Sequence, residues 1–434
     1  MRETRYAGVV PGRSWLSGAL PPAAETGRPA ADRDVEAPGA AGGLIDPAIV
    51  ISSDTTGLAV IRSLGRRGVP VVALYYDANN HGYVSRYVRE RGRVPHPERR
   101  EEEFVRALLD GAPRWEGGVL FPCSDAALAT VSRYKASLAS HYRVACPEWQ
   151  IAQAFLDKKH TYELARSIGV PAPRTIVLRS MEDVEKHGPG AEYPCLVKPS
   201  QGHRYFELFR TKMVLVKDFD ELLAAYVRAA EHGLEVMLQE FIPGEDSRGV
   251  NYNGYFADGK PVAEFTAEKL ASAPPTLGSP CVVKSSRIPG VLEAGRKLLA
   301  AACFYGFACT EFKEDARDGV YKLMEVNGRH NLSAQLAIRC GLDFPWIEYR
   351  HLVQGVLPQA GESDYEVGVY WIDLVRHLGN SLKYFGQGSY RPGRILEPYL
   401  HPHVFATLDG RDPRPFLKRC AHLVGRAFGR GRGE

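Results

Sequence analysis

The chain has 434 residues, enough for two or three domains that each bury a core. Its composition is that of an ordinary globular protein, with 44% hydrophobic and 24% charged residues, and a net charge of +4 is too small to indicate a nucleic-acid partner. No run of about 18 uncharged apolar residues is present to span a membrane. The eight cysteines form no CxxC pair and no Cys/His ligand pattern, which favours reduced thiols in a cytoplasmic protein over disulfides or structural zinc.

The first 45 residues differ in composition from the rest of the chain. They are rich in proline, alanine, glycine and arginine, and none of their apolar runs is long enough for the core of a signal peptide. We therefore expect residues 1–45 to form a disordered extension.

Residues 46–147 alternate between short apolar runs and amphipathic segments, a pattern typical of an α/β domain with a mostly parallel sheet. The turn after the first predicted strand lies where such folds bind anions, at the start of a helix. This turn holds a single glycine, Gly57, so the G-x-G-x-x-G fingerprint of dinucleotide binding is absent. Asp54, Thr55 and Thr56 are either helix caps or part of an anion site, and we favour the caps.

Two apolar runs, FACTEFK and VYKLMEVN, lie on either side of the dipeptide Asp318-Gly319. An Asp-Gly between such runs is a strong hairpin signal, because glycine takes the positive φ that a tight turn needs. A turn near Asp318 places Glu311 opposite or diagonal to Glu325. Since side chains alternate between the faces of a strand, two sets are expected to share a face: Cys309, Glu311 and Lys313 on the first strand, and Leu323, Glu325 and Asn327 on the second.

Two carboxylates at this separation repel each other unless a cation lies between them. With the amide of Asn327, Glu311 and Glu325 form a set of hard oxygen ligands that suits Mg²⁺ or Mn²⁺, and a site with few carboxylates usually receives Mg²⁺ together with phosphates. The alternative is a hairpin with a solvated charged face, which is the ordinary meaning of glutamates on a strand. The hairpin residues alone do not separate these two interpretations.

Lys198 stands inside the otherwise apolar run of a predicted strand, EYPCLVKPS. A buried ammonium is costly unless it is paired, and a phosphate would be such a partner. The alternative is a lysine at the end of a strand whose ammonium reaches water. Further along, the strand LEVMLQEF runs into Pro243-Gly244. Backbone groups leaving it are suited to bind a planar base, with Glu240 or Asp246 accepting from a ribose hydroxyl.

The chain ends in a basic segment that has an apolar face at helical spacing. Six residues form that face: Phe416, Leu417, Cys420, Leu423, Val424 and Phe428. Such a helix either lies on an acidic membrane surface or packs on the protein, and packing is the favoured interpretation. His401 and His403 have no evident third ligand, so we assign no metal there.

The order of the polar motifs is more specific than any one of them. A lysine follows Asp157 on a helix that ends in GVPAP, and the motifs VKP, QEFIPGED, EKL and TEF…EVNGR come after it. This series, over about residues 46–360, resembles the ATP-grasp superfamily, and within it carboxylate–amine ligases of the D-aspartate ligase type. The resemblance implies an α/β pre-ATP-grasp domain with a parallel sheet over 46–147. It further implies an ATP-grasp domain of two α+β subdomains over 148–360 and a C-terminal extension with a basic tail over 361–434.

The resemblance also implies a nucleotide site and a metal site. The residues implied to contact ATP are, at the phosphates, Lys158, Lys198 and Lys269 and, at the adenine and ribose, Gln239, Glu240, Phe241, Ile242 and Asp246, with Glu245 as the alternative to Asp246. The residues implied to hold two Mg²⁺ ions, with Mn²⁺ as an alternative, are Glu311, Glu325 and Asn327. Lys269 at the γ-phosphate and Arg329 at the acyl-phosphate oxygens are implied to act in catalysis.

The implied reaction activates a carboxylate with ATP as an acyl phosphate, which an amine then attacks to form an amide, releasing ADP and phosphate. The implied partners are small carboxylate and amine substrates such as amino acids, with no nucleic acid, and a homodimer is left open. Asn331 and Ser333 lie where relatives contact substrate. Two alternatives stay open: an ATP-binding regulatory module without turnover, and a ligase that forms a thioester or releases the acyl phosphate.

Two departures from the family pattern bear on the site. The usual N-P-R is Asn327-Gly328-Arg329 here, which leaves the loop freer than proline would make it. The loop after Lys198 carries a single glycine, Gly202, where many relatives have several. We therefore expect this loop to cover the phosphates differently or poorly.

Overall fold

The computed structural model describes residues 45–427 apart from 201–204, 206–207, 210, 277 and 360–363. The predicted extension over residues 1–45, except for its last residue, and the loop that contains Gly202 therefore lie outside the described residues. The described residues belong to a single unit, Gly43–Glu434. The domain boundaries at residues 147 and 360 stay predictions.

The first of three sheets is parallel throughout, as expected for the N-terminal α/β region. Its strands lie in the order β3-β2-β1-β4-β5, with bounds β1 Ala48–Ile51, β2 Val71–Tyr75, β3 Val88–Arg93, β4 Val119–Pro122 and β5 Arg143–Val144. Its helices are α1 Thr55–Arg66, α2 Glu101–Trp115, α3 Asp125–Arg133 and α4 Lys135–Leu138. Asp54 Oδ1 accepts the backbone N–H groups of Thr56 and Gly57 at 2.9 and 3.2 Å, which confirms that it caps α1.

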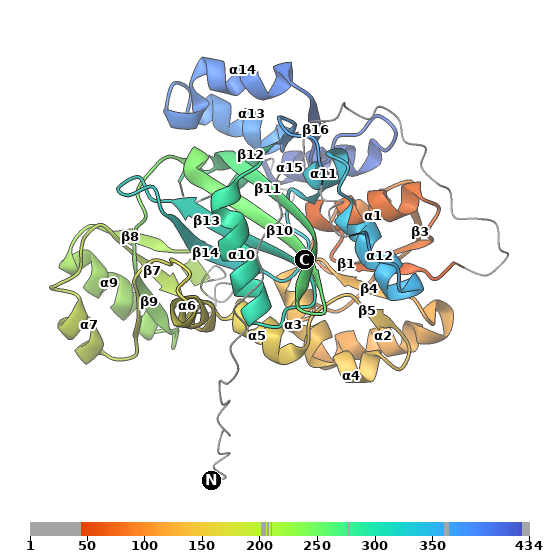
Figure 1. The fold of residues 1–434 in the computed structure, drawn as a ribbon, viewed down its shortest axis with the longest axis horizontal. Coiled ribbons are helices and arrows are strands. Elements are labelled where there is room, and N and C mark those ends of the chain that lie inside the picture. Colours follow the sequence, from red (N-terminus) through yellow and green to blue (C-terminus); the bar gives the residue numbers. More distant parts are fainter. Residues whose placement is uncertain are drawn as a thin grey trace, which may run out of the picture. The chain divides into compact units, whose positions relative to one another are not determined.

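The second sheet is small and antiparallel, with α5 Trp149–Leu156 and α6 Lys158–Ser167 leading into it from the first sheet. Its order is β6-β9-β7-β8, with bounds β6 Thr175–Leu178, β7 Cys195–Pro199, β8 Val214–Val216 and β9 Val236–Glu240. Helices α7 (Met181–His187) and α9 (Phe219–Ala230) complete this part, which Figure 1 shows beside the third sheet.

The third sheet has seven strands in the order β14-β13-β10-β11-β12-β15-β16. Its bounds are β10 Gly249–Ala257, β11 Lys260–Ala273, β12 Ser279–Ser285, β13 Gly306–Glu314, β14 Tyr321–Asn327, β15 Tyr370–Ile372 and β16 His403–Phe405. All pairs are antiparallel except β15 with β16. The helices that follow its strands are α10 Pro289–Ala301, α11 Ala334–Arg339 and α12 Phe344–Gln354.

Two separate apolar cores lie on the two faces of this long sheet. On one face Leu298 and Leu299 of α10 pack with Tyr252 of β10. On the other face Leu336 of α11 packs with neighbouring strands. A Cβ at Gly295 would lie 2.3 Å from the Tyr252 ring, so glycine is what lets α10 approach the sheet this closely.

Strands β13 and β14 form the predicted hairpin, and Glu311 pairs with Glu325 as expected. Gly319 takes a φ of +73° in the turn, the conformation that favours glycine. One part of the prediction is wrong, because the register shifts after Glu311 and Leu323 pairs with Phe312. Met324 is the extra residue of this bulge, so Leu323 lies in the apolar core instead of sharing a face with Glu325.

The C-terminal region contributes structure to the third sheet, since β15 and β16 both come from it. Its helices are α13 Leu374–Lys383, α14 Pro392–Leu400 and α15 Arg414–Ala427. Arg419 of α15 pairs with buried Asp373 at 2.8 Å. Leu417 and Val424 are nevertheless 60% and 55% exposed, so the expectation that the apolar face of this helix packs on the protein is wrong for these residues. Phe428 lies outside the described residues.

A buried ion pair ties this C-terminal region to the first sheet. Arg62 of α1 and Asp412 are fully buried, and Arg62 Nε donates to Asp412 Oδ2 at 3.0 Å. Asp412 also accepts the Ser85 hydroxyl at 2.7 Å and the Arg86 backbone N–H at 2.9 Å. Removing one member would leave a buried charge without its partner, which costs far more than breaking a surface pair. Among the helices of the described part, none is both long and apolar enough to cross a bilayer.

We predict that Asp412→Ala lowers the free energy of unfolding by about 3 kcal/mol or more, measured by urea denaturation. The matched control is Glu366→Ala, which removes the exposed pair with Arg339 and should cost at most about 1 kcal/mol. Equal effects of the two substitutions would show that the buried pair does not hold the C-terminal region in place.

Candidate active site

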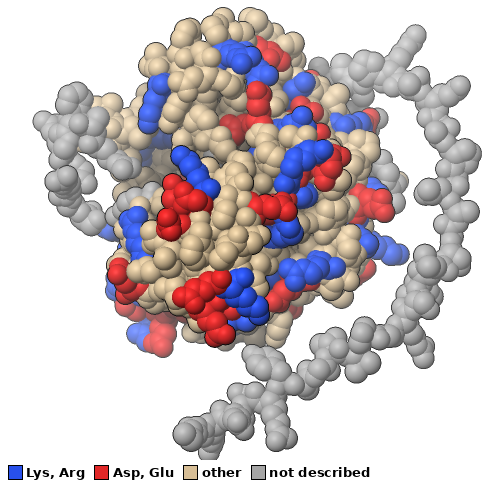
Figure 2. Space-filling view, turned by 90° about the vertical axis from the view of Figure 1, so that its left-hand side faces the viewer, with Lys and Arg blue, Asp and Glu red and all other residues tan. Residues whose placement is uncertain are grey.

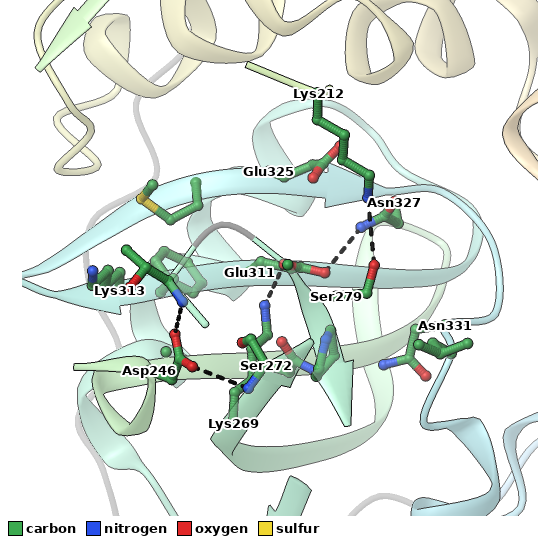
Figure 3. A pocket seen from close by; sticks show the side chains of 18 of the residues that line it. Lys212, Asp246, Lys269, Ser272, Ser279, Glu311, Lys313, Glu325, Asn327 and Asn331 are labelled. Carbon is green, nitrogen blue, oxygen red and sulfur yellow. Dashed lines mark hydrogen bonds and ion pairs between the residues drawn. The ribbon is translucent and has the colours of Figure 1, made fainter. Parts of the chain in front are cut away.

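A cavity of about 330 Å³ opens between the second and third sheets (Figure 3). Strand β7 and the segment before β8 line one side, and strands β10 to β14 line the other. Nine of the predicted site residues line it: Lys198, Phe241, Ile242, Asp246, Lys269, Glu311, Glu325, Asn327 and Arg329. The other three, Lys158, Gln239 and Glu240, are not part of its lining.

Strand pairing sets three oxygen-bearing side chains in one row on the cavity side of the sheet. Glu325 of β14 pairs with Glu311 of β13, which pairs in turn with Asn251 of β10. Directly paired residues point to the same face, so these side chains are neighbours across three strands. The row exists because the bulge at Met324 turns Glu325 and Asn327 toward the cavity while Leu323 stays in the core.

Each carboxylate of the pair has its own lysine. Lys158 Nζ, at the start of α6, donates to Glu325 Oε1 at 2.6 Å, and Lys269 of β11 donates to Glu311 Oε2. Burial raises the pKa of Glu325, but the Lys158 ammonium beside it outweighs burial and holds this pKa at about 2. Burial lowers the pKa of both lysines, and their carboxylate partners reverse the shift. Glu325, Lys158 and Lys269 are therefore charged at neutral pH.

The donor set fits Mg²⁺ that arrives with a phosphate ligand. Within the described residues no group of three His, Cys, Asp or Glu side chains could hold a metal ion. Glu311, Glu325 and the amide of Asn327 offer only part of a coordination shell, and Mg²⁺ at such sites completes its shell with water and phosphate oxygens. The same phosphates would give Lys158 and Lys269 new anionic partners when the carboxylates take the metal.

Arg329 lies at the rim and joins the site to the first sheet. Its guanidinium donates to both carboxylate oxygens of Asp125 at 2.7 and 3.1 Å, and to Asn327 Oδ1 at 3.1 Å. Asp125 is the first residue of α3, so the N-terminal part of the chain contributes this residue to the cavity lining. A bidentate arginine–carboxylate pair fixes the plane of the guanidinium as well as its position.

The loop that carries Arg329 is anchored despite Gly328, where the family pattern predicted a freer loop. His330 is 3% exposed, stacks on Phe307 with ring centroids 4.5 Å apart, and lies 2.9 Å from Glu348 Oε2 of α12. Asn331 donates to Asn253 Oδ1 at 2.9 Å. These contacts, made by the second and third residues after Gly328, restrain the loop in place of the proline of the family pattern.

Two lysines reach the cavity from the second sheet. Lys198 of β7 is only 5% exposed, and no partner for its ammonium is seen among the described residues. Lys212 crosses the cavity to Ser279 Oγ at 3.4 Å, as Figure 3 shows. The charges of both lysines help to lower the pKa of Glu325 across the cavity. A wall that carries two ammonium groups is suited to receive phosphate oxygens.

The side chains of Gln239 and Glu240, two residues of the predicted adenine hinge, are not part of the cavity lining, and the backbone contacts predicted for the hinge stay a prediction. Gln239 is fully buried and its amide donates to Thr175 Oγ1 at 2.9 Å, away from the cavity. The Glu240 carboxylate is held by Lys322 at 3.1 Å and by Arg317, and its backbone N–H donates to a neighbouring strand. The side chains of Gln239 and Glu240 therefore have protein partners outside the cavity lining.

Phe241 and Ile242 do line the cavity, just after β9 ends. Lys313 Nζ donates to the backbone carbonyls of Ile242 and Gly244 at 2.9 and 3.0 Å, which fixes this segment against β13. Within the part of the chain that is described, the Ile242 N–H has no recorded partner. It is thus placed to donate to a flat acceptor such as a base.

Asp246 lines the cavity, and its oxygens accept backbone N–H groups of Ser272 and Thr276 at 3.0 and 2.9 Å. A carboxylate has about four acceptor positions, so it retains capacity for ligand hydroxyls. Glu245, the alternative from the sequence, pairs with Arg394 at 2.7 Å and is not part of the lining.

Sequence reasoning missed several residues of this cavity. Lys212 was an ordinary loop lysine in the sequence, and Leu196 and Met213 carried no polar signal. Lys313 was expected to share a face with Glu311 but was given no role in the site. Asn251 is the most informative omission, because it is 2% exposed and its Oδ1 has no partner among the described residues. A buried polar atom without a partner beside Glu311 is expected to meet a donor or cation in the occupied site.

Two curated ligases are similar in sequence to this chain. Over 236 residues it is 25% identical to a D-aspartate ligase of Enterococcus faecium, with 52% of this chain and 56% of that protein covered. Over 227 residues it is 26% identical to a D-alanine–D-alanine ligase of Ectopseudomonas mendocina, with 48% and 66% covered. The chain thus matches between about half and two thirds of the length of these relatives. No protein-family model matches the sequence.

Solved structures share the fold at lower identity. The biotin carboxylase domain of Hydrogenobacter thermophilus 2-oxoglutarate carboxylase, crystallised with MgADP and bicarbonate, has a TM-score of 0.59 at 16% identity, covering 76% of this chain and 74% of that one. An L-amino acid ligase from Bacillus licheniformis has a TM-score of 0.57 at 16% identity, covering 73% and 76%. These likenesses confirm the fold class predicted from the sequence.

We predict that Lys158→Met moves the pKa of Glu325 upward from about 2, because burial then acts without the ammonium that offsets it. The measurement is a ¹³C NMR pH titration of labelled glutamate carboxylates. In the wild type the folded pKa is depressed, so the pair stabilises the fold above about pH 4.5, and this stabilisation is lost as the pH falls toward 2. The control Lys159→Met should leave the titration unchanged, and an identical titration in both variants would contradict the assigned pair.

Proposed function

We propose that this chain is an ATP-dependent ligase of the ATP-grasp type that joins a carboxylate to an amine, as its similarity to D-aspartate and D-alanine–D-alanine ligases supports. The observation that carries the proposal is the row formed by Glu311 and Glu325 with a lysine on each carboxylate, facing Lys198 across the cavity. When a metal–triphosphate complex binds, the two carboxylates could exchange their lysines for the metal, and the two lysines could exchange their carboxylates for phosphate oxygens.

The chemistry begins with a repulsion problem. A substrate carboxylate and a triphosphate are both anions, so cations must lie between them before they can react. We assign Lys158 and Lys198 to the α- and β-phosphates and Lys269 to the γ-phosphate. Mg²⁺, for which Mn²⁺ could substitute, would be held by Glu311, Glu325 and Asn327, and when bound it supplies charge neutralisation of the transferring phosphoryl group.

The reaction then has two balanced steps. A carboxylate oxygen attacks the γ-phosphorus, the bond from that phosphorus to the ADP oxygen breaks, and an acyl phosphate forms. The amine nitrogen next attacks the acyl carbon, the bond from carbon to the phosphate oxygen breaks, and an amide and inorganic phosphate result. The amine gives up a proton, which leaves with phosphate or water. Arg329, held flat by Asp125, is positioned to bind the acyl-phosphate oxygens.

The substrates proposed are small amino acids or similar molecules. The cavity lining beyond Lys269 is built from neutral amides and hydroxyls, among them Asn251, Asn331 and Ser333. At the rim Arg329 and Asp125 offer one cation and one anion, which suits a molecule that carries both a carboxylate and an ammonium. The relatives named for D-aspartate, D-alanine and L-amino acids support this class.

We predict that incubation with Mg-ATP and a panel of amino acids and small carboxylic acids releases ADP from at least one combination. Glu325→Gln should lower that release by at least about 100-fold, because it weakens the metal site. Its thermal transition should fall because the pair with Lys158 is lost, while a native circular dichroism spectrum shows that the variant is still folded. The control Glu366→Gln changes a carboxylate far from the cavity lining and should behave as wild type. Nucleotide binding without any ADP release would favour a regulatory module and overturn the ligase assignment.

We predict that Asp246→Asn raises the KM for ATP about tenfold while kcat changes little, since one acceptor of the ribose is lost away from the reacting phosphate. Steady-state kinetics with varied ATP measure this. The comparison variant is Glu245→Gln, whose carboxylate pairs with Arg394 outside the cavity lining. A rise of the KM in Glu245→Gln alone would move the ribose contact to that residue.

A further inference from the structure

The C-terminal region exposes an unusual amount of apolar surface. Among the described residues, eight of the fifteen exposed large apolar side chains lie between residues 378 and 424: Leu378, Leu382, Phe385, Leu396, Leu400, Leu417, Leu423 and Val424. Leu382 and Leu400 are 85% and 80% exposed. Single exposed leucines are ordinary, but such a concentration marks a surface with a partner.

Helices α13 and α14 carry four of these side chains, Phe385 lies just after α13, and the two helices lie against each other. His377 of α13 stacks on Tyr399 of α14 with centroids 5.6 Å apart, and its Nδ1 lies 2.8 Å from the Tyr399 hydroxyl. Helix α13 contacts β11 and β12 on its inner side, and His377 is buried. Leu378 and Leu382 are one helical turn apart on α13, as Leu396 and Leu400 are on α14, so each helix presents an apolar ridge outside its packed face.

The same region is strongly basic. Residues 374–434 hold eleven lysines and arginines against four aspartates and glutamates, an excess of seven positive charges in a chain whose total is +4. Lys383 and Arg391 are exposed beside the apolar ridges. Figure 2 shows the top of the molecule, where Figure 1 places α13 and α14, as mainly uncharged, with a few basic side chains and some acidic ones among them.

We propose that α13 and α14, with α15 beside them, form a docking surface for a bilayer that contains anionic phospholipid. Apolar side chains that insert at the level of the acyl boundary, together with cations that meet the lipid phosphates, are the two requirements for binding in the interface plane. The apolar ridges supply the first requirement, and the exposed Lys383 and Arg391 beside them supply the second. Binding of this kind needs no membrane-spanning helix, and none is found among the described residues.

The basic charge of this surface favours an anionic bilayer over two other occupants, a second copy of the chain and the N-terminal residues of the same chain. A second copy of the chain, placed by a twofold axis, would bring the same basic surface against itself, and like charges would repel. The N-terminal residues 1–44 hold five basic and five acidic residues, so they offer no net negative charge to this surface. An anionic lipid surface complements both properties of the face.

The experiment is sedimentation of the full chain with phosphatidylcholine vesicles that contain or lack about 30% phosphatidylglycerol. We expect binding at least tenfold stronger to the anionic vesicles, falling as salt is raised. The double variant Leu382→Ser/Leu400→Ser should lose at least about tenfold of that binding. Lys383→Glu should lose about fivefold or more, because it removes one cation and adds an anion.

Matched controls lie in the second sheet region, where Val227→Ser changes an exposed apolar residue of α9 and Lys186→Glu an exposed lysine of α7. Both should bind vesicles as wild type does. Absent binding, or equal binding to both vesicle types, overturns the proposal. A concentration-dependent dimer in light scattering that Leu382→Ser/Leu400→Ser abolishes would assign the face to a second copy instead. ADP release is not used as a readout, so this test is independent of the ligase assignment.

Discussion

The site depends on one electrostatic constraint, the pairing of two carboxylates on adjacent strands. Glu311 and Glu325 could not both stay ionised beside each other without compensation, and the compensation comes from two lysines on different elements. Lys158 comes from α6 and Lys269 from β11, so charge balance links a helix and three strands at one point. A cation that binds the two carboxylates displaces the two lysines, which then need a new anionic partner. The site therefore favours a metal that binds together with an anion over either one alone.

Much of this was predictable because the signals are local. The Asp-Gly dipeptide fixed the turn, and counting back from it paired Glu311 with Glu325. The bulge at Met324 was not predictable, because strand alternation is the only rule the residues suggest, and Leu323 was assigned to the wrong face. The side-chain partners of Glu240 in the predicted hinge could not be predicted either, because Arg317 and Lys322 lie far away in the sequence.

Contacts between distant segments account for the rest of what the sequence could not predict. Asp125 and Arg329 are separated by 204 positions, and Arg62 and Asp412 by 350. Strands β15 and β16 have three residues each, too short for a periodic signal, yet they extend the third sheet. The apolar face of α15 had the right spacing for burial, but spacing does not say whether a neighbour is present to cover it.

The most direct measurement is a crystal structure with Mg²⁺ and a non-hydrolysable ATP analogue. The account predicts that the metal lies between Glu311 and Glu325, and that the Nζ atoms of Lys158 and Lys269 leave these carboxylates for phosphate oxygens, with the base beside Ile242. A nucleotide bound elsewhere, or one bound here while both lysine–carboxylate pairs stay intact and no metal lies between the glutamates, would contradict it.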